Sequence, residues 1–141
     1  MRPLYETAQD RDNEKSISEI LEAEFGCQLT KMPMKLGLDF MACRSGSAVA
    51  FIEAKRRKNK MFDYPTYMIS LHKMMAASSL TQCTGLKCFL AVQWADAIGL
   101  CEMPAESMDI RLGGTSRRGD PQDMEPMVYF DLSKFKVIAN L

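Results

Sequence analysis

The sequence predicts an α/β fold in which a mixed central sheet is flanked by helices. Three observations indicate this fold. A helical apolar pattern covers residues 13–25, three strand-like segments follow within residues 27–55, and a second helical stretch precedes an apolar segment of strand length. The predicted order is therefore α-β-β-β-α-β, which favours a sheet packed between helices.

The first predicted helix covers residues 13–25, and residues 1–12 are expected to form a loosely held arm. Apolar side chains at positions 17, 20, 21 and 25 share one face at roughly 100° per residue, and Gly26 is a typical helix stop. Three strands are predicted next, at residues 27–31, 38–43 and 48–55. Arg44-Ser45-Gly46-Ser47 is a hairpin turn signal between the last two strands.

The second predicted helix covers residues 66–83, opened by Tyr64-Pro65-Thr66 and ended by Gly85. The apolar residues 87–94 predict a strand, and residues 97–101 predict another strand paired to it through a turn near Asp96. A Gly-rich loop is expected at 113–121, a last strand at 127–132, and a single helical turn at Leu132-Ser133.

The length, net charge and cysteine content of the sequence argue against several classes of protein. A length of 141 residues predicts one domain, residues 1–141, and a net charge of zero argues against coating nucleic acid by bulk attraction. The five cysteines are scattered singly and there is one histidine, which argues against a structural zinc site or a disulfide framework. No apolar run is long enough to span a membrane and the N-terminus is polar, so we expect a cytoplasmic protein.

The third predicted strand carries the most informative residues. Alternation along residues 48–55 places Val49, Phe51, Glu53 and Lys55 on one face. The apolar approach predicts burial, and a buried carboxylate beside an ammonium is costly unless the two pair or bind something. Glu-x-Lys therefore puts an oxygen ligand and a cation side by side at the end of a strand.

Hairpin register decides whether Asp39 joins this pair. If residues 45–47 form a three-residue loop, Arg44 pairs with Ala48 and Asp39 lies opposite Glu53, with Cβ atoms roughly 5 Å apart. That spacing suits one Mg²⁺ or Mn²⁺ between the carboxylates. A two-residue or four-residue loop places Asp39 opposite Ile52, on the wrong face, unless a β-bulge restores the register.

Asp39, thirteen intervening residues and then Glu53-Ala54-Lys55 resemble the signature of the PD-(D/E)XK nuclease superfamily, which includes restriction endonucleases, archaeal Holliday-junction resolvases and VRR-type nucleases. The restriction-endonuclease-like core of that superfamily is likewise αβββαβ. The resemblance covers about residues 13–95 and leaves 96–141 as a C-terminal extension. Leu38 stands where the superfamily has proline. Segments at 64–67, 70–73 and 84–86 look most like small stand-alone nucleases of phage and prophage genomes.

The resemblance implies a metal-dependent endonuclease. Asp39, Glu53 and the backbone carbonyl of Ala54 would bind Mg²⁺ or Mn²⁺, which lowers the pKa of a bound water and polarises the phosphate. Lys55 would orient or deprotonate that water, or neutralise charge in the transition state. The sequence leaves these two roles of Lys55 open.

Relatives often add an acid from the first helix and a basic or amide side chain from the second. Glu14 is the choice among the acids at 14, 19, 22 and 24, because it lies near the buried face; the alternative is an acid that only stabilises the helix N-terminus. Lys73 fits the second position, with Ser70 and Tyr67 on the same predicted helix face. The alternative for Lys73 is an ordinary surface lysine.

DNA is the expected partner, with RNA left open. Candidate contacts to the nucleic acid are the basic run of Arg56, Arg57, Lys58 and Lys60, the helix residue Ser70, and the loop residues Arg117 and Arg118. A solvated basic turn and an ordinary mobile loop are the alternatives for the basic run and the loop. Little room remains for a recognition domain, which favours structure-selective or weakly sequence-specific cleavage. A homodimer would cut two strands, in the host cytoplasm if the protein is phage-encoded. The rival hypothesis is an inactive nucleic-acid-binding module on the same fold.

Overall fold

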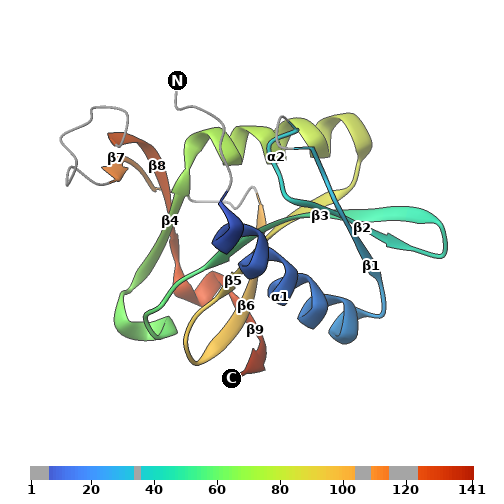
Figure 1. Cartoon of the computed structure of the whole chain (residues 1–141). Helices are drawn as coiled ribbons and strands as arrows, with labels where there is room; N and C mark the ends of the chain where they lie inside the picture. The colour runs from blue at the N-terminus through green and yellow to red at the C-terminus, as the bar shows by residue number, and fades with distance from the viewer. Residues whose placement is uncertain (1–6, 34–35, 104–108, 115–123) are drawn as a thin grey trace.

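The structure is a computed structural model that describes residues 7–33, 36–103, 109–114 and 124–141 (Figure 1). A six-stranded sheet has the strand order β1-β2-β3-β5-β6-β9, and a three-stranded sheet has the order β4-β8-β7. The elements are α1 (Ala8–Phe25), β1 (Gln28–Lys31), β2 (Phe40–Arg44), β3 (Ser47–Arg56), β4 (Thr66–Ser70), α2 (Leu71–Thr84), β5 (Lys87–Gln93), β6 (Ala97–Met103), β7 (Asp109–Gly114), β8 (Met124–Asp131) and β9 (Lys136–Asn140), with short 3-10 turns η2 (Met61–Asp63) and η4 (Leu132–Lys134).

The six-stranded sheet is mixed. Strands β3 and β5 pair in parallel, whereas β1–β2, β2–β3, β5–β6 and β6–β9 pair antiparallel. A parallel pair needs a crossover connection, which here contains β4 and α2. The predicted α/β class with a mixed central sheet is therefore confirmed.

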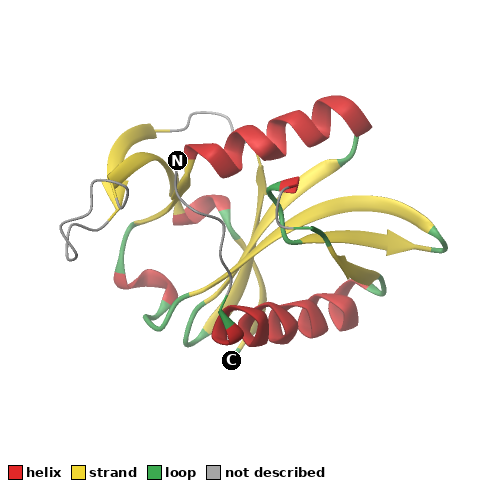
Figure 2. Ribbon diagram, turned by 45° about the horizontal axis from the view of Figure 1, so that its top comes forward, coloured by secondary structure: helices red, strands yellow, loops and turns green. Residues whose placement is uncertain are grey.

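The two helices pack on opposite faces of this sheet (Figure 2). Ile17 and Leu21 of α1 belong to one apolar cluster with Ile52 of β3. Met74 of α2 belongs to the other cluster, with Phe51. Because adjacent residues of a strand face opposite sides, β3 divides its side chains between the two clusters, and the Phe51 side also carries Glu53 and Lys55.

Helix α1 begins five residues earlier than the pattern of apolar residues predicts. The Thr7 side chain accepts a hydrogen bond from the Asp10 N–H, and the Asp10 side chain accepts one from the Thr7 N–H. This capping box satisfies two of the free amides at the helix start. Residues 8–12 are therefore helical, and only the part of the predicted arm at residues 7–12 falls within the described chain.

The prediction of one helix over residues 66–83 was wrong for residues 66–70. Residues 66–70 form β4, which pairs with β8, and α2 starts only at Leu71. Tyr67 and Ile69 alternate with more exposed neighbours, and these aromatic and β-branched residues favour a strand. Ser70 ends the strand and caps the helix, because its hydroxyl accepts a hydrogen bond from the Lys73 N–H.

The C-terminal residues contain more strand than predicted. Residues 113 and 114 end β7 instead of belonging to a loop, and the remainder of the predicted loop, 115–121, lies outside the described residues. Strand β9, also unpredicted, pairs with β6 at the edge of the central sheet. The predicted helical turn after β8 is present as η4. Neither helix of the described chain is both long and apolar enough to cross a membrane.

Candidate active site

A β-bulge sets Asp39 beside Glu53. The hairpin turn has two residues, Ser45 and Gly46, both in the left-handed region at φ 52° and 78°, so Arg44 pairs with Ser47. The register then shifts between Ala42 and Cys43, and beyond the bulge Phe40 pairs with Ile52. One further step places Asp39 next to Glu53. Of the alternatives that the sequence left open, the structure has the two-residue turn with a bulge, and the bulge restores the register that a three-residue loop would have produced.

Asp39 directly precedes β2 and extends its hydrogen-bonded pairing with β3, once through its backbone and once through its side chain. The Asp39 N–H donates to the Ile52 carbonyl at 3.2 Å, and Oδ2 of Asp39 accepts a hydrogen bond from the Ala54 N–H at 2.9 Å. The N–H and C=O of one strand residue point to the same edge, so the Ala54 carbonyl also faces the Asp39 side. The Asp39 carboxylate and the Ala54 carbonyl, two of the predicted metal ligands, therefore lie at the same end of β3.

Glu53 is a fully buried acid held between two lysines. Its exposed fraction is 0%, and its Oε2 lies 3.4 Å from Lys55 Nζ and 3.3 Å from Lys73 Nζ. Lys73 also donates to the Gly37 carbonyl at 2.7 Å, which ties α2 to the segment before Asp39. Neither Glu53 oxygen has a hydrogen-bond partner among the described residues.

Burial and charge move the pKa values of these groups in opposite directions. Burial raises the pKa of Glu53 to about 7, with the Asp39 charge adding to the effect and both lysines opposing it. Burial also acts to raise the pKa of Asp39, but the Ala54 hydrogen bond and the lysine charges overcome it and lower that pKa. Burial opposes the charge of Lys55, yet Glu53, Tyr67 and Asp39 outweigh it and raise the pKa of Lys55.

A second acid and a further lysine approach Asp39 from the other side. Glu14 of α1 forms an ion pair with Lys31 of β1, and Lys31 Nζ also lies 3.6 Å from Asp39 Oδ1. Burial raises the pKa of Glu14 to about 7 against the effect of Lys31. Glu14 lies in the second turn of α1, beyond the capped N-terminus, so the alternative of a plain N-terminal acid does not hold.

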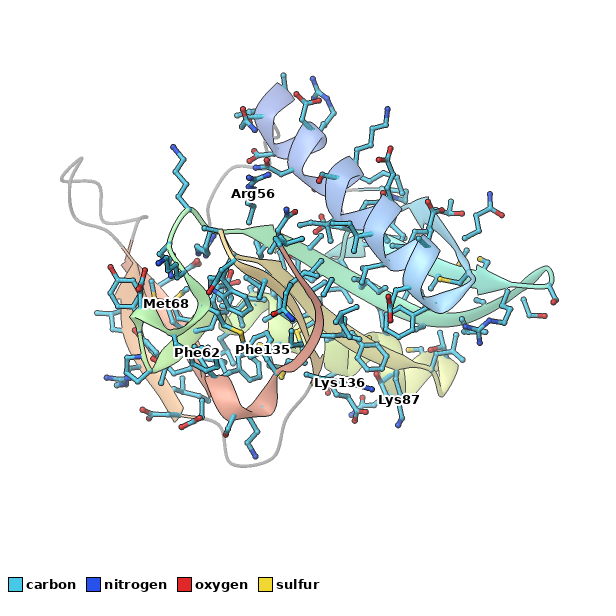
Figure 3. The ribbon with its side chains drawn as sticks, turned by 90° about the horizontal axis from the view of Figure 1, so that it is seen from below. Arg56, Phe62, Met68, Lys87, Phe135 and Lys136 are labelled. Atoms are coloured by element: carbon cyan, nitrogen blue, oxygen red, sulfur yellow. The ribbon has the colours of Figure 1, made fainter. Side chains whose placement is uncertain are left out.

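These residues line one cleft of about 280 Å³. Arg56 and Arg57, which end and follow β3, border it together with Asp10 of α1. Figure 3 shows Arg56 on the side of β3 that lies near the start of α1. The cleft therefore combines the buried Glu53 and the half-buried Asp39 and Glu14 with a rim of arginine side chains, the combination expected where a phosphate meets a cation site.

Three of the predicted residues, Lys58, Lys60 and Ser70, lie outside this cluster. Lys58 and Lys60 are exposed on the segment after β3 and do not line the cleft. Ser70 is engaged as the cap of α2. Lys73, in contrast, contacts Glu53 directly, so the alternative of an ordinary surface lysine does not hold. Arg117 and Arg118 lie outside the described residues.

Sequence reasoning missed Lys31. No local motif marks this residue, which is the last of a four-residue strand. Its place depends on the pairing of Lys31 with Phe40, because that register brings the end of β1 next to Asp39. A strand register between two short segments is a non-local property, so only the assembled sheet identifies the residue.

The donor set fits a hard divalent cation. Among the described residues, no three acidic, histidine or cysteine side chains form a ready-made metal cluster. Asp39 and Glu53 nevertheless offer two neighbouring carboxylates, and the Ala54 carbonyl adds a third oxygen. Mg²⁺ typically binds one or two carboxylates and completes its shell with water and substrate phosphate. The Glu53 oxygens accept no hydrogen bond from the described residues, which is consistent with a ligand role.

The fold and this cluster define a nuclease of the PD-(D/E)XK class. The chain belongs to the family described as "Phage putative PDDEXK endonuclease", which it matches over residues 1–138. Its structure is similar to that of the Holliday junction resolvase Hjc from Archaeoglobus fulgidus, with a TM-score of 0.60 and 14% sequence identity over 89% of this chain and 86% of that chain. At this identity the likeness shows the fold alone. A search of curated proteins found no match.

Proposed function

We propose that this nuclease uses Mg²⁺ or Mn²⁺ to hydrolyse phosphodiester bonds in DNA, with structure-selective or weakly sequence-specific action. The observation that carries the proposal is the Glu53 carboxylate, fully buried beside Asp39 and without hydrogen-bond partners among the described residues. A buried carboxylate in this state is unfavourable, and a bound cation would compensate it. Asp39, Glu53 and the Ala54 carbonyl would hold the ion, and Glu14, which borders the same cleft, is proposed as the source of a further oxygen.

The ion, when bound, supplies two effects, a lower pKa for water and polarisation of the phosphate. The protein residues then have separate tasks. Lys55 has a raised pKa and keeps its proton at neutral pH, which favours stabilisation of transition-state charge over proton abstraction. Lys73 places a second ammonium beside the same Glu53 oxygen and would also stabilise the transition-state charge. The Ala54 N–H holds Oδ2 of Asp39, so Oδ1, which now faces Lys31, would be the oxygen available to the cation.

The substrate backbone would be held beside this cluster. Arg56 and Arg57 border the cleft, and exposed Lys58 and Lys60 extend the basic segment away from it. Arginine and lysine contacts to phosphate position a nucleic acid without reading its sequence. Neutral overall charge with a local basic segment supports a protein that binds DNA at one place only. Arg117 and Arg118 stay proposed as further phosphate contacts, and a homodimer that cuts two strands stays a proposal.

A cleavage assay tests the proposed function. Wild-type protein, Glu53→Gln and Lys55→Ala would be incubated with branched, single-stranded and duplex DNA, with Mg²⁺, with Mn²⁺ or with EDTA. We expect metal-dependent cutting by the wild type, none by Glu53→Gln, and a loss of about 10²–10³-fold for Lys55→Ala. Exposed Glu102→Gln is the matched control and should cut normally. Equal behaviour of all variants, or cutting in EDTA, would refute the proposal.

The acid from α1 can be assigned by a paired comparison. Glu14 lies in the cleft and Glu19 is exposed on the same helix. Mn²⁺ calorimetry should show weaker binding for Glu14→Gln and unchanged binding for Glu19→Gln. DNA binding by the wild type without cutting under any metal condition would instead favour the inactive binding module.

A further inference from the structure

A second cavity of about 380 Å³ adjoins the cleft. It lies within the range of roughly 300–1,000 Å³ that small-ligand sites occupy. Its lining is mainly aromatic and apolar, and it comes from the segment after β3, from β4, and from the ends of β5 and β8. Residues that the nuclease chemistry does not use, including Tyr64, Met68 and Trp94, form its walls.

The inner wall of this cavity is rigid. The Tyr67 ring packs edge-on against Trp94 at 6.0 Å between ring centroids, and Trp94 packs edge-on against Phe135 at 5.3 Å. All three side chains are buried, so their rotamers are fixed by the core. The Tyr67 hydroxyl has no hydrogen-bond partner among the described residues. A flat ligand would therefore meet a preformed wall and would not have to order it.

The outer wall is an exposed aromatic ring. Tyr64 retains 63% of its surface in contact with solvent, although it borders an apolar cavity. Phe62, two residues earlier, is 74% exposed and does not line the cavity. Figure 3 shows Phe62 and Met68 on the same side of the molecule. Exposed aromatic rings next to a basic segment are typical of surfaces that bind unpaired nucleotides.

Arg57 joins the two cavities. It lines both the acidic cleft and the aromatic cavity, and its guanidinium lies 4.9 Å from the centroid of the Tyr67 ring. Its backbone N–H is fixed by the Gln93 carbonyl at 2.9 Å. A phosphate held by Arg57 would thus have the acidic cluster on one side and the aromatic cavity on the other.

We propose that the aromatic cavity binds an unpaired nucleobase of the DNA strand whose phosphate is cut. The base stacks on Tyr64 while Arg57 holds the adjoining phosphate, so the preferred substrate carries a flipped-out or bulged nucleotide next to the scissile bond. This inference rests on the proposed function, because it takes the strand in the cleft to be the substrate.

The chemistry of the cavity favours a base over other parts of DNA. Phosphates and sugars are polar and are weakly stabilised by contact with aromatic rings. Every base, in contrast, has a flat π-face that stacks on such rings. Stacking tolerates all four bases, which agrees with weak sequence specificity. A base in a continuous duplex is already stacked on its neighbours, so the cavity selects bases that are free of the stack.

Binding in EDTA tests this inference independently of catalysis. Fluorescence anisotropy would compare the full chain on a duplex with a single adenine bulge, on the same duplex with an abasic residue in the bulge, and on a fully paired duplex. We expect the adenine bulge to bind about tenfold more tightly than the abasic bulge. Tyr64→Ala should bring that ratio close to one.

Phe62→Ala is the matched control, because it removes an equally exposed ring that lies outside the cavity. It should keep the tenfold ratio. Thermal unfolding of both variants should match the wild type, since neither ring is buried. A wild-type ratio of one, or an equal loss in Phe62→Ala and Tyr64→Ala, would overturn the inference.

The two proposals fail in different ways. If the adenine bulge binds more tightly than the abasic bulge in EDTA but no DNA is cleaved under any metal condition, the proposed function is refuted and the base site is retained. Metal-dependent cleavage without any preference for the adenine bulge would sink the base site alone.

Discussion

The Lys73 ammonium on α2 lies 3.3 Å from Oε2 of Glu53 on β3, and its charge lowers the pKa of that acid against the effect of burial. Removing Lys73 should therefore raise the pKa of Glu53 further. Because a carboxylate must be charged to bind a cation, the pH midpoint of Mn²⁺ binding should move to higher pH in Lys73→Gln.

Calorimetric titrations with Mn²⁺ between pH 5.5 and 8.5 would measure that midpoint. Lys87→Gln is the control, since Lys87 forms an exposed pair with Glu102 at 3.2 Å, away from the cleft. A midpoint in Lys73→Gln that stays at the wild-type pH would show that Lys73 does not act on Glu53.

The raised pKa of Glu53 predicts a pH-dependent stability of the metal-free protein. In the unfolded chain the Glu53 carboxyl loses its proton near pH 4.5, whereas in the folded chain it does so near pH 7. The folded state therefore holds more protons between these values, and the free energy of unfolding falls as the pH rises through this window. Glu53→Gln should be more stable than the wild type at pH 8 by about 1–3 kcal/mol.

Urea unfolding in EDTA at pH 5 and pH 8 would measure this effect. Glu102→Gln, which changes an exposed carboxylate, should keep the wild-type pH dependence. If Glu53→Gln loses as much stability between the two pH values as the wild type does, the buried acid is not the cause.

Lys31 would compete with a divalent cation for the same oxygens. Its ammonium pairs with Glu14 and lies 3.6 Å from Asp39 Oδ1. A cation that binds Asp39 has to displace this interaction, so Lys31→Met should bind Mn²⁺ more tightly, by up to about fivefold for a partly exposed pair. Lys31→Arg keeps the positive charge and should bind Mn²⁺ as the wild type does. Weaker Mn²⁺ binding by Lys31→Met would mean that Lys31 instead positions the acids.

Gly37 is required by a close contact. It has φ +90°, and a Cβ atom there would lie 2.7 Å from the Cβ of Ala76 on α2. Gly26 also has positive φ, at +60°, but a Cβ there meets nothing within 4 Å. Gly37→Ala should therefore cost about 1–3 kcal/mol more than Gly26→Ala, measured by urea unfolding. Equal costs would show that α2 shifts freely at this contact.

The sequence was sufficient for the centre of the site because its signals are local. Alternation along residues 48–55 and the turn at Ser45-Gly46 define one hairpin, and this hairpin, with a bulge that the sequence left open, brings Asp39 to Glu53. The prediction of a mixed sheet followed from the order of elements. The roles of Asp39, Glu53 and Lys55 remain predictions, whereas their proximity is a structural fact.

The parts that sequence reasoning missed depend on longer-range pairing. Strand β4 is five residues long and runs directly into α2, so its period-two pattern is too short to stand out against the helical pattern that follows. Its strand conformation depends on hydrogen-bonded pairing with β8, which lies about sixty positions further along the chain. The placement of Lys31 likewise follows from the pairing of β1 with β2.

The bulge between Ala42 and Cys43 has a consequence for finding distant relatives of this nuclease. The same two-residue turn without the bulge would bring the two acids opposite each other with one residue fewer between them, because the bulge adds one residue to β3. One amino acid can therefore be gained or lost near the tip of the hairpin while the far end stays fixed. The number of residues between Asp39 and Glu53 can thus vary, and a sequence search that demands thirteen intervening residues would pass over proteins whose corresponding acids superimpose on these.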